Sequence, residues 1–419
     1  MFSILTNAWK VKEIRKKMLV VLGLVAIYRL GTHIPLPGVN LVTWQYMRSQ
    51  GTNQTLFATI AGGGTGTIFS MGIGPYITAS IIMQLLCVAI PKLEQIQKEG
   101  QDGRKKINQY TRFVAVGLSL LQGAGTVFSL NQQGFFFHPG WFTWIMATLA
   151  MITGTMFVMW LSELLTEKGI GNGSSFIIFS NIIAGAPAAV AMAVNIVTAK
   201  EILPIIAMVA LIILFIALAA FAILIQDGER RIPVQYSKKM VGRQMYGGQS
   251  TYMPIKVNIA GVMAIIFAIS LLQFPATLAG FFNTPWLVKL NEVLALTHPI
   301  GAVVYMILIV CFTFFYTSFA VNPNEMAENM RKNGGFIPGI RPGKPTSDYI
   351  QRTVHRLSVI GSFFYVVLAM APIIFQAIFK MSVGFGGTTL LIVTGTALEI
   401  VKQLESQLLM RHYKGFLNN

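Results

Sequence analysis

Long apolar segments alternate with short polar segments along this 419-residue chain. A helix that crosses a bilayer needs about 20 consecutive, mostly apolar residues. Segments of this kind predict ten membrane-spanning helices, two of them in the charge-free stretch 113–162, which has a polar turn at 131–140. The predicted spans lie at 18–35, 49–91, 113–162, 169–199, 202–226, 257–288, 293–324, 357–379 and from 382 onward. The pattern therefore predicts an all-α polytopic membrane protein.

The second span differs from the others because glycines crowd its first half, between residues 62 and 74. Each glycine inside a helix costs roughly 1 kcal/mol relative to alanine, and Pro75 lacks a backbone donor. We expect a short, weakly helical piece, a break near residues 72–75, and a regular helix from Ile77 onward. Hydrocarbon tolerates broken backbone only beside protein or a water-filled cavity. The segment therefore predicts a conduit through the membrane.

The basic residues indicate the orientation of the predicted helices. Most of the 32 Lys and Arg residues lie in the N-terminal segment, in the loops after the second, sixth and eighth helices, and near the C-terminus. The positive-inside rule places these segments, and with them both termini, in the cytosol. Five helices precede the short outer link near 198–203 and five follow it. Halves with odd helix numbers have opposite topology, so we expect an N-terminal half at 1–197 and a C-terminal half at 198–419.

Composition and charge narrow the classes of partner. Only 11% of residues are charged, against about 25% in soluble domains, and the net charge is +17. Because the basic residues lie in short loops, anionic lipids and cytosolic partners are favoured over nucleic acid. Two cytosolic loops, 227–256 and 321–356, are longer than turns require, and they either carry function or only orient the chain by charge. Cys87 and Cys311 both lie in apolar segments and predict packing thiols rather than metal ligands.

Two other classes compete with a passive channel. An ion-coupled solute transporter shares inverted topology and broken helices, but it usually keeps acids in mid-membrane, whereas Glu163 and Glu399 lie near cytosolic ends. A membrane enzyme needs a nucleophile with a base, paired acids or a metal cluster, and no such set stands out. The sequence predicts no enzyme activity, no metal and no cofactor. Energy for transport must then come from a partner, because no nucleotide-binding loop is present.

Seven motifs in order resemble the bacterial SecY family, whose members form the protein-conducting channel of the Sec translocon. They are HIPLPGVN at 33–40, IFSMGIGPYITASIIMQLL at 68–86, GRKKINQYTR at 103–112, GTMFVMWLSELLTEKGIGNG at 154–173, GQSTYMPIKVNIAGV at 248–262, GFIPGIRPGKPT at 335–346 and FGGTTLLIV at 385–393. The resemblance implies ten helices in two inverted halves around an hourglass pore with a lateral exit. It also implies a location in the bacterial cytoplasmic membrane.

The resemblance further implies a pore ring, a plug and a gate. The ring comprises Ile73, Ile77, Ile178, Ile266 and Ile392, with Ser174 at a position where the family commonly has isoleucine. The plug, at about 55–70, includes Phe57, Ile60, Gly63, Thr65 and Ile68. Gln84 and Asn258 are the polar members of the lateral gate. A flexible outer loop is the alternative for the plug, and ordinary interhelical hydrogen bonding is the alternative for the two gate residues.

The two long cytosolic loops resemble the family's docking platform for the ribosome or the SecA motor. The resemblance assigns contacts to basic residues of both loops, namely Arg230, Arg231, Lys238, Lys239, Arg243 and Arg341. Guanidinium groups suit this role because they bind carboxylates and phosphates bidentately. The other implied partners are the small membrane subunits SecE and SecG, and client polypeptides that bear signal peptides.

Overall fold

The computed structural model describes residues 6, 8–44, 64, 66–198, 202–236, 239–241, 244–246, 250–282, 284–296, 298–379 and 387–417. The chain divides into two compact units. Unit 1 comprises Met1–Pro204, Ile269–Ala295 and Thr396–Asn419, and unit 2 comprises Ile205–Ala268 and Leu296–Gly395. The helices α11 (Met263–Phe282) and α16 (Gly387–Leu417) pass from unit 2 into unit 1.

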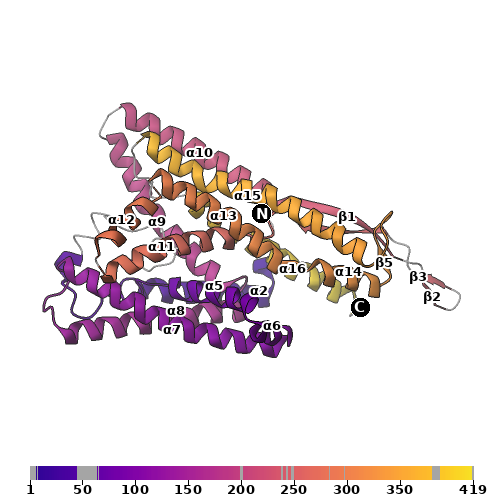
Figure 1. The fold of residues 1–419 in the computed structure, drawn as a ribbon, viewed down its shortest axis with the longest axis horizontal. Helices are drawn as coiled ribbons and strands as arrows, with labels where there is room; N and C mark the ends of the chain where they lie inside the picture. Colours follow the sequence, from indigo (N-terminus) through magenta and orange to yellow (C-terminus); the bar gives the residue numbers. More distant parts are fainter. Residues whose placement is uncertain are drawn as a thin grey trace. The chain divides into compact units, whose positions relative to one another are not determined.

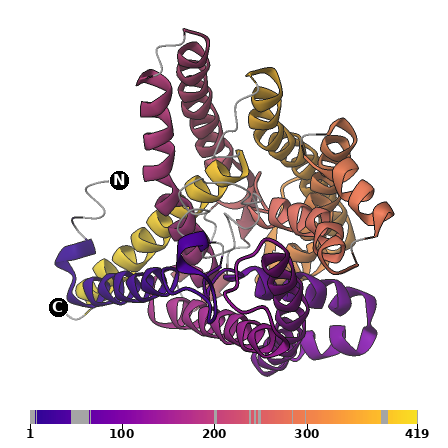
Figure 2. The same cartoon turned by 90° about the vertical axis from the view of Figure 1, so that its left-hand side faces the viewer.

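Unit 1 is a helical bundle. Its elements are α2 (Lys12–Gly31), α5 (Gly74–Ala89), α6 (Pro91–Lys98), α7 (Gln101–Gln132), α8 (Trp141–Lys168), α9 (Gly173–Thr198) and α12 (Pro285–Leu294). Figures 1 and 2 show α7 and α8 running side by side, and α8 also packs against α9 and α2. Helix α5 packs against α7 and is followed by α6 after a bend of 103°. Pro75 and Pro91 lie in first turns, where a missing backbone N–H costs nothing.

Unit 2 combines helices with a small antiparallel sheet. The helices are α10 (Ile202–Asp227), most of which lies in this unit, α13 (Pro299–Ala320), α14 (Pro323–Lys332) and α15 (Lys344–Phe379). The strands β1 (Glu229–Tyr236), β4 (Ser250–Lys256) and β5 (Gly335–Phe336) form a sheet of order β4-β1-β5. A second pair, β2 (Lys239–Val241) and β3 (Gln244–Tyr246), is also antiparallel. Helix α15 packs against both α13 and α14.

A helix overlaps each span that the sequence predicts. Among the described residues, five helices are long and apolar enough to cross a membrane, or up to six if the bent pair α5 and α6 counts as one span. Shorter apolar helices lie at Gly173–Gly185 and Met263–Leu272. The predicted break near residues 72–75 overlaps the observed start of α5, which begins at Gly74, three residues before the predicted Ile77. Helix α7 begins at Gln101, well before the apolar stretch that starts at residue 113. Its first turns are polar and exposed, so apolar length alone did not reveal them.

The two long loops that the sequence predicts to be cytosolic fold into one module, and this folding was not predicted. Figure 1 shows β1 and β5 beside the N-terminal part of α15. In β1, Ile232 and Val234 are buried, while the residues between and beside them are exposed. The two buried side chains share an apolar core with Ile350 and Val354 of α15. We call β1, β4, β5, α14 and the part of α15 in this core the cytosolic module, after the side on which the positive-inside rule predicts it.

Candidate functional site

The irregular segment 66–73, which enters α5, is fastened to the loop that carries the HIPLPGVN motif. The amide of Leu36 donates to the carbonyl oxygen of Gly66 at 3.0 Å, and the amide of Ile68 donates to that of Ile34 at 3.1 Å. Backbone groups within a membrane must find partners inside the protein. The motif therefore satisfies backbone groups that a continuous helix would have satisfied internally.

Side-chain packing fixes the same segment from two helices. The buried ring of Phe69 stacks on Tyr28 of α2, with centroids 5.8 Å apart, and fills the space left by the absent side chain of Gly31. On α8, a Cβ atom at Gly154 would overlap the carbonyl oxygen of Ile68. The described end of the predicted plug is thus closely packed at Ile68. The predicted plug residues outside the described part of the chain are Phe57, Ile60, Gly63 and Thr65.

All five isoleucines of the predicted ring are buried, with exposed fractions of at most 7%. In unit 1, Ile73 immediately precedes α5, its carbonyl oxygen accepts from the amide of Ile77 at 3.1 Å, and Ile178 lies on α9. In unit 2, Ile266 lies on α11 and Ile392 on α16. Such burial argues against lipid-facing side chains and leaves helix packing or a ring. Membership of the ring remains a prediction.

Ser174, at the uncertain sixth position, contacts a neighbouring helix. Its hydroxyl oxygen lies 2.9 Å from that of Ser162 on α8, which is buried. The backbone amide of Ser174 donates to the Oδ1 atom of Asn172 at 3.0 Å, so Asn172 caps the start of α9. The side chain of Ser174 is therefore engaged in packing between α8 and α9.

The two predicted gate residues form local hydrogen bonds, each within its own unit. Gln84 donates from Nε2 to the hydroxyl of Ser80, one turn earlier on α5, at 3.3 Å. Its buried Oε1 atom has no hydrogen-bond partner among the described residues. Asn258 accepts at Oδ1 from the amide of Gly261 at 2.8 Å, which closes the turn before α11. An acceptor on Gln84 thus remains available for another polar group.

A polar cluster between α2 and α9 was not predicted from the sequence. The hydroxyl of Tyr28 donates to Asn181 Oδ1 at 2.9 Å, and both residues are buried. Arg29 donates to the hydroxyl of Ser180 at 3.0 Å and also to the carbonyl oxygen of Ser180. Consecutive Tyr and Arg in an apolar span were the available signal, because polar groups at that depth need partners. The cluster holds α2 against the turn of α9 that follows Ile178.

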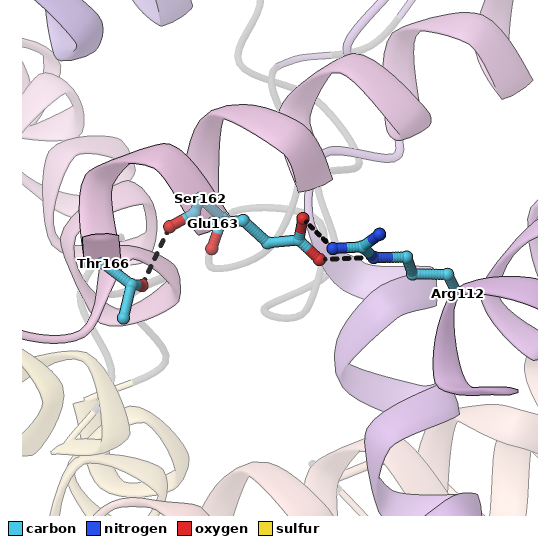
Figure 3. Close-up of polar contacts among 4 residues, drawn as sticks. All are labelled: Arg112, Ser162, Glu163 and Thr166. Carbon is cyan, nitrogen blue, oxygen red and sulfur yellow. Dashed lines mark hydrogen bonds and ion pairs between the residues drawn. The ribbon is translucent and has the colours of Figure 1, made fainter. Parts of the chain in front are cut away.

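A second polar cluster lies near the C-terminal end of α8 (Figure 3). The carboxylate of Glu163 accepts two hydrogen bonds from Arg112 of α7, at 2.8 Å from Nε and 2.7 Å from Nη2. The hydroxyl of Thr166 donates to the carbonyl oxygen of Ser162 and accepts from the amide of Gly173, both at 2.9 Å. The sequence had placed Glu163 near this end of the span but had not predicted its partner.

The described arginines of the predicted docking platform are exposed. Arg230 and Arg231 lie on β1, and Arg341 lies in the turn before α15. Arg231 donates from Nε to Glu229 at 2.7 Å, an exposed pair that contributes little to stability. Lys239 begins β2, whereas Lys238 and Arg243 lie outside the described residues.

These features define a polytopic α-helical membrane protein with a broken, internally satisfied segment inside its helical bundle. The sequence model of the SecY family matches residues 67–401. The chain belongs to the SecY family.

Curated relatives and solved structures agree with this assignment. The protein translocase subunit SecY of Halalkalibacterium halodurans is 43% identical over 434 residues, and that of Aquifex aeolicus is 41% identical over 432, each covering all of both chains. A solved protein-conducting channel covers 94% of this chain and 92% of its own, with 20% identity and a TM-score of 0.66. Sec61 in a canine ribosome-channel complex has 17% identity, the same coverage and a TM-score of 0.62. At these identities the solved structures support the fold alone.

Proposed function

We propose that this chain is the central subunit of a protein-conducting channel. It passes unfolded secretory polypeptides across the cytoplasmic membrane of a bacterium and releases apolar segments sideways into the lipid. The observation that carries the proposal is the similarity to SecY translocase subunits over the whole chain. The broken segment before α5, with its backbone satisfied by neighbouring loops, is consistent with a pore lining.

The proposed architecture has ten spans in two inverted halves, 1–197 and 198–419, around an hourglass pore. A helix at each predicted span and the uneven distribution of basic residues support it. Both termini are cytosolic in this arrangement, and the cytosolic module faces the same side. Binding of anionic lipids to the basic segments follows from the net charge of +17.

In this proposal the five buried isoleucines form an apolar ring that blocks ions by dewetting and yields to a passing chain. A passing chain displaces the plug, which is predicted at about 55–70 and whose described end packs at Ile68 against Gly154 of α8. Gln84 and Asn258 line the lateral gate, where the Oε1 atom of Gln84, which has no partner within the described part of the chain, meets a polar group of the gate or of a client.

The cytosolic module is the proposed docking platform. Its exposed Arg230, Arg231 and Arg341 suit carboxylates of a motor protein or phosphates of ribosomal RNA. The similar Sec61 and yeast Ssh1 channels were solved in complexes with ribosomes. We extend this partner to the present chain, together with SecA, SecE, SecG and signal-bearing clients. The chain has no proposed catalytic role or cofactor, so the ribosome or SecA supplies the energy.

An ion-coupled solute transporter is the less favoured alternative. Glu163, one of the two acids in the predicted spans, is engaged by Arg112, which leaves it poorly suited to bind a transported ion. Among the described residues, no group of three or more His, Cys, Asp or Glu side chains is placed to hold a metal ion.

Reconstitution tests the proposed function. Vesicles containing this chain and SecE are given SecA, ATP and a radiolabelled secretory precursor, and protection of the precursor from protease is measured. We expect protection that requires ATP and an intact signal peptide. A precursor without its signal peptide is the matched control. Equal protection of both precursors, or uptake of small solutes without protection, would contradict the channel.

A further inference from the structure

The cytosolic end of α8 contacts two neighbouring helices through adjacent residues. Glu163 accepts a two-pronged ion pair from Arg112 of α7, and the hydroxyl of Ser162 pairs with that of Ser174 in the first turn of α9 (Figure 3 shows the first contact). In a forked pair both oxygens engage one planar guanidinium, so the pair fixes orientation as well as distance. One turn of α8 thus restrains two helices.

The junction between α8 and α9 has little room for other side chains. A Cβ atom at Gly173 would overlap the carbonyl oxygen of Ser162 and would lie 2.8 Å from the Cβ of Leu165. The amide of Gly173 is held by the hydroxyl of Thr166. These contacts fix the first turn of α9 against α8. In this arrangement the hydroxyl of Ser174 contacts that of the buried Ser162.

We propose that the end of α8 is a positioning junction, in which Arg112 and Glu163 hold α7 and the hydroxyls of Ser162 and Ser174 hold α9. The inference rests on the proposed function, in which Gln84 of α5, a helix that packs against α7, lines the lateral gate and α9 carries Ile178 of the ring. The three helices then move as one body when the gate opens. Ser174 belongs to this junction rather than to the ring, which leaves the five isoleucines as the members of the proposed ring.

The exposure of the ion pair makes its test feasible. The side chains of Arg112 and Glu163 are 50% and 30% exposed, so water can solvate whichever charge remains after one is removed. Single-charge variants should therefore fold. The exposed pair Lys98–Glu94, at 2.6 Å within α6, links no two helices and provides a matched control.

The charge arm is tested with E163Q, R112Q, R112K and the exchange R112E/E163R in the full chain with SecE. Spin labels on α7 and α8 report the interhelical distance, and planar bilayers report the ion conductance of the resting channel. We expect E163Q and R112Q to broaden the distance distribution and to raise conductance at least threefold. R112K keeps the charge but cannot donate two parallel hydrogen bonds, so its distance distribution and conductance should lie between those of R112Q and the wild type. The exchange R112E/E163R should recover at least half of the change in both quantities. The control E94Q should match the wild type.

The proposal is overturned if E163Q and R112Q match the wild type, or if the exchange variant is no better than either. The distances are measured without a client, so they test the junction even if the wild type fails to translocate. That failure would count against the proposed function instead.

The hydroxyl arm is tested with S174I, S162A and the double variant S162A/S174I. Isoleucine at 174 meets the hydroxyl of Ser162, so we expect S174I to lower the thermal unfolding midpoint. The double variant should recover at least half of the loss, because removing the hydroxyl of Ser162 relieves both the crowding and the unpaired polar group. A single variant S174I that is as stable as the wild type and leaks less would overturn this arm, because it would place residue 174 in the ring.

Discussion

The segment 66–73 and the cytosolic module both bring distant parts of the chain together, but they do so by different means. In the segment, single backbone hydrogen bonds to residues 34–36 and close contacts at glycines of α2 and α8 hold an irregular strand of chain. In the module, a regular sheet lies over an apolar core, and its strand β1 exposes Arg230 and Arg231. The segment is held between helices by close backbone contacts, whereas the module has its own apolar core, as a small soluble domain does.

This difference indicates how each region can fail. The segment depends on the absence of side chains at a few positions, so added volume should damage it more than lost volume. The module depends on buried apolar area, so lost volume should damage it most. It also indicates separable functions, because damage to the module should leave the constriction of the proposed channel intact.

Removal of core volume from the module should give the largest effect. Ile232 of β1 is 1% exposed and packs with residues of α14 and α15. Ile232→Ala should destabilise the module by about 2–5 kcal/mol, through lost transfer free energy and a residual cavity. Limited proteolysis in detergent should then cut within 229–256 and near 335, at least tenfold faster than in the wild type.

The matched control for this prediction is Gln235→Ala, on the exposed face of the same strand. It should leave both proteolysis and resting conductance unchanged. Ile232→Ala should also leave resting conductance unchanged, while SecA binding weakens. A rise in ion leak in Ile232→Ala would show that the module and the constriction are not separable.

The positions of the apolar helices could be predicted because apolar length and charge are local properties of the sequence. The count of ten spans stays a prediction, because five or up to six of the described helices are long and apolar enough to cross a membrane. The start of α5 could be predicted to within three residues, because glycine and proline disfavour the interior of a helix. The helix begins at Gly74 rather than Ile77, because proline is tolerated in a first turn. The sheet of the module could not, because β5 has only two residues and pairs with β1 from a distant part of the chain. Neither β1 nor β5 has enough alternation of apolar and polar residues to distinguish it from a basic loop in the sequence.

The candidate site was predicted only as a set of positions. Burial of the five isoleucines agrees with their assignment, but burial alone does not distinguish a ring from packing. The partners of Tyr28, Glu163 and Ser174 depend on how α2, α7, α8 and α9 pack, and no spacing in the sequence encodes this packing. A polar residue in a span indicates that it needs a partner, but it does not identify the partner.

Added volume at Gly154 should give the second largest effect and should disturb the opposite region. A methyl group there would overlap the carbonyl oxygen of Ile68, and relief of this overlap requires a shift of the backbone rather than of a flexible side chain. Gly154→Ala should destabilise the protein by about 1–3 kcal/mol and raise resting ion conductance, while SecA binding stays unchanged. Thermal unfolding and planar-bilayer recordings measure the two quantities.

Gly117 on α7 provides the control, because a Cβ atom there meets no heavy atom within 4 Å. Gly117→Ala should be neutral or stabilising by up to about 1 kcal/mol. If both alanines behave alike, then helix propensity alone explains them, and the packing of Ile68 on α8 carries no special weight.

The smallest effect should come from the cap of α14, and it tests whether the module behaves like a soluble domain. The Oδ1 atom of Asn322 accepts from the amide of Glu325 at 3.4 Å, at the start of a helix that packs on α15. Loss of such a cap typically costs about 1 kcal/mol, so Asn322→Ala should accelerate hydrogen exchange in α14 about fivefold and leave conductance unchanged. Asn329→Ala, the same substitution at an exposed position within α14, should slow exchange slightly because alanine favours the helix interior. Equal exchange rates in the two variants would mean that packing on α15, rather than the cap, determines the stability of α14.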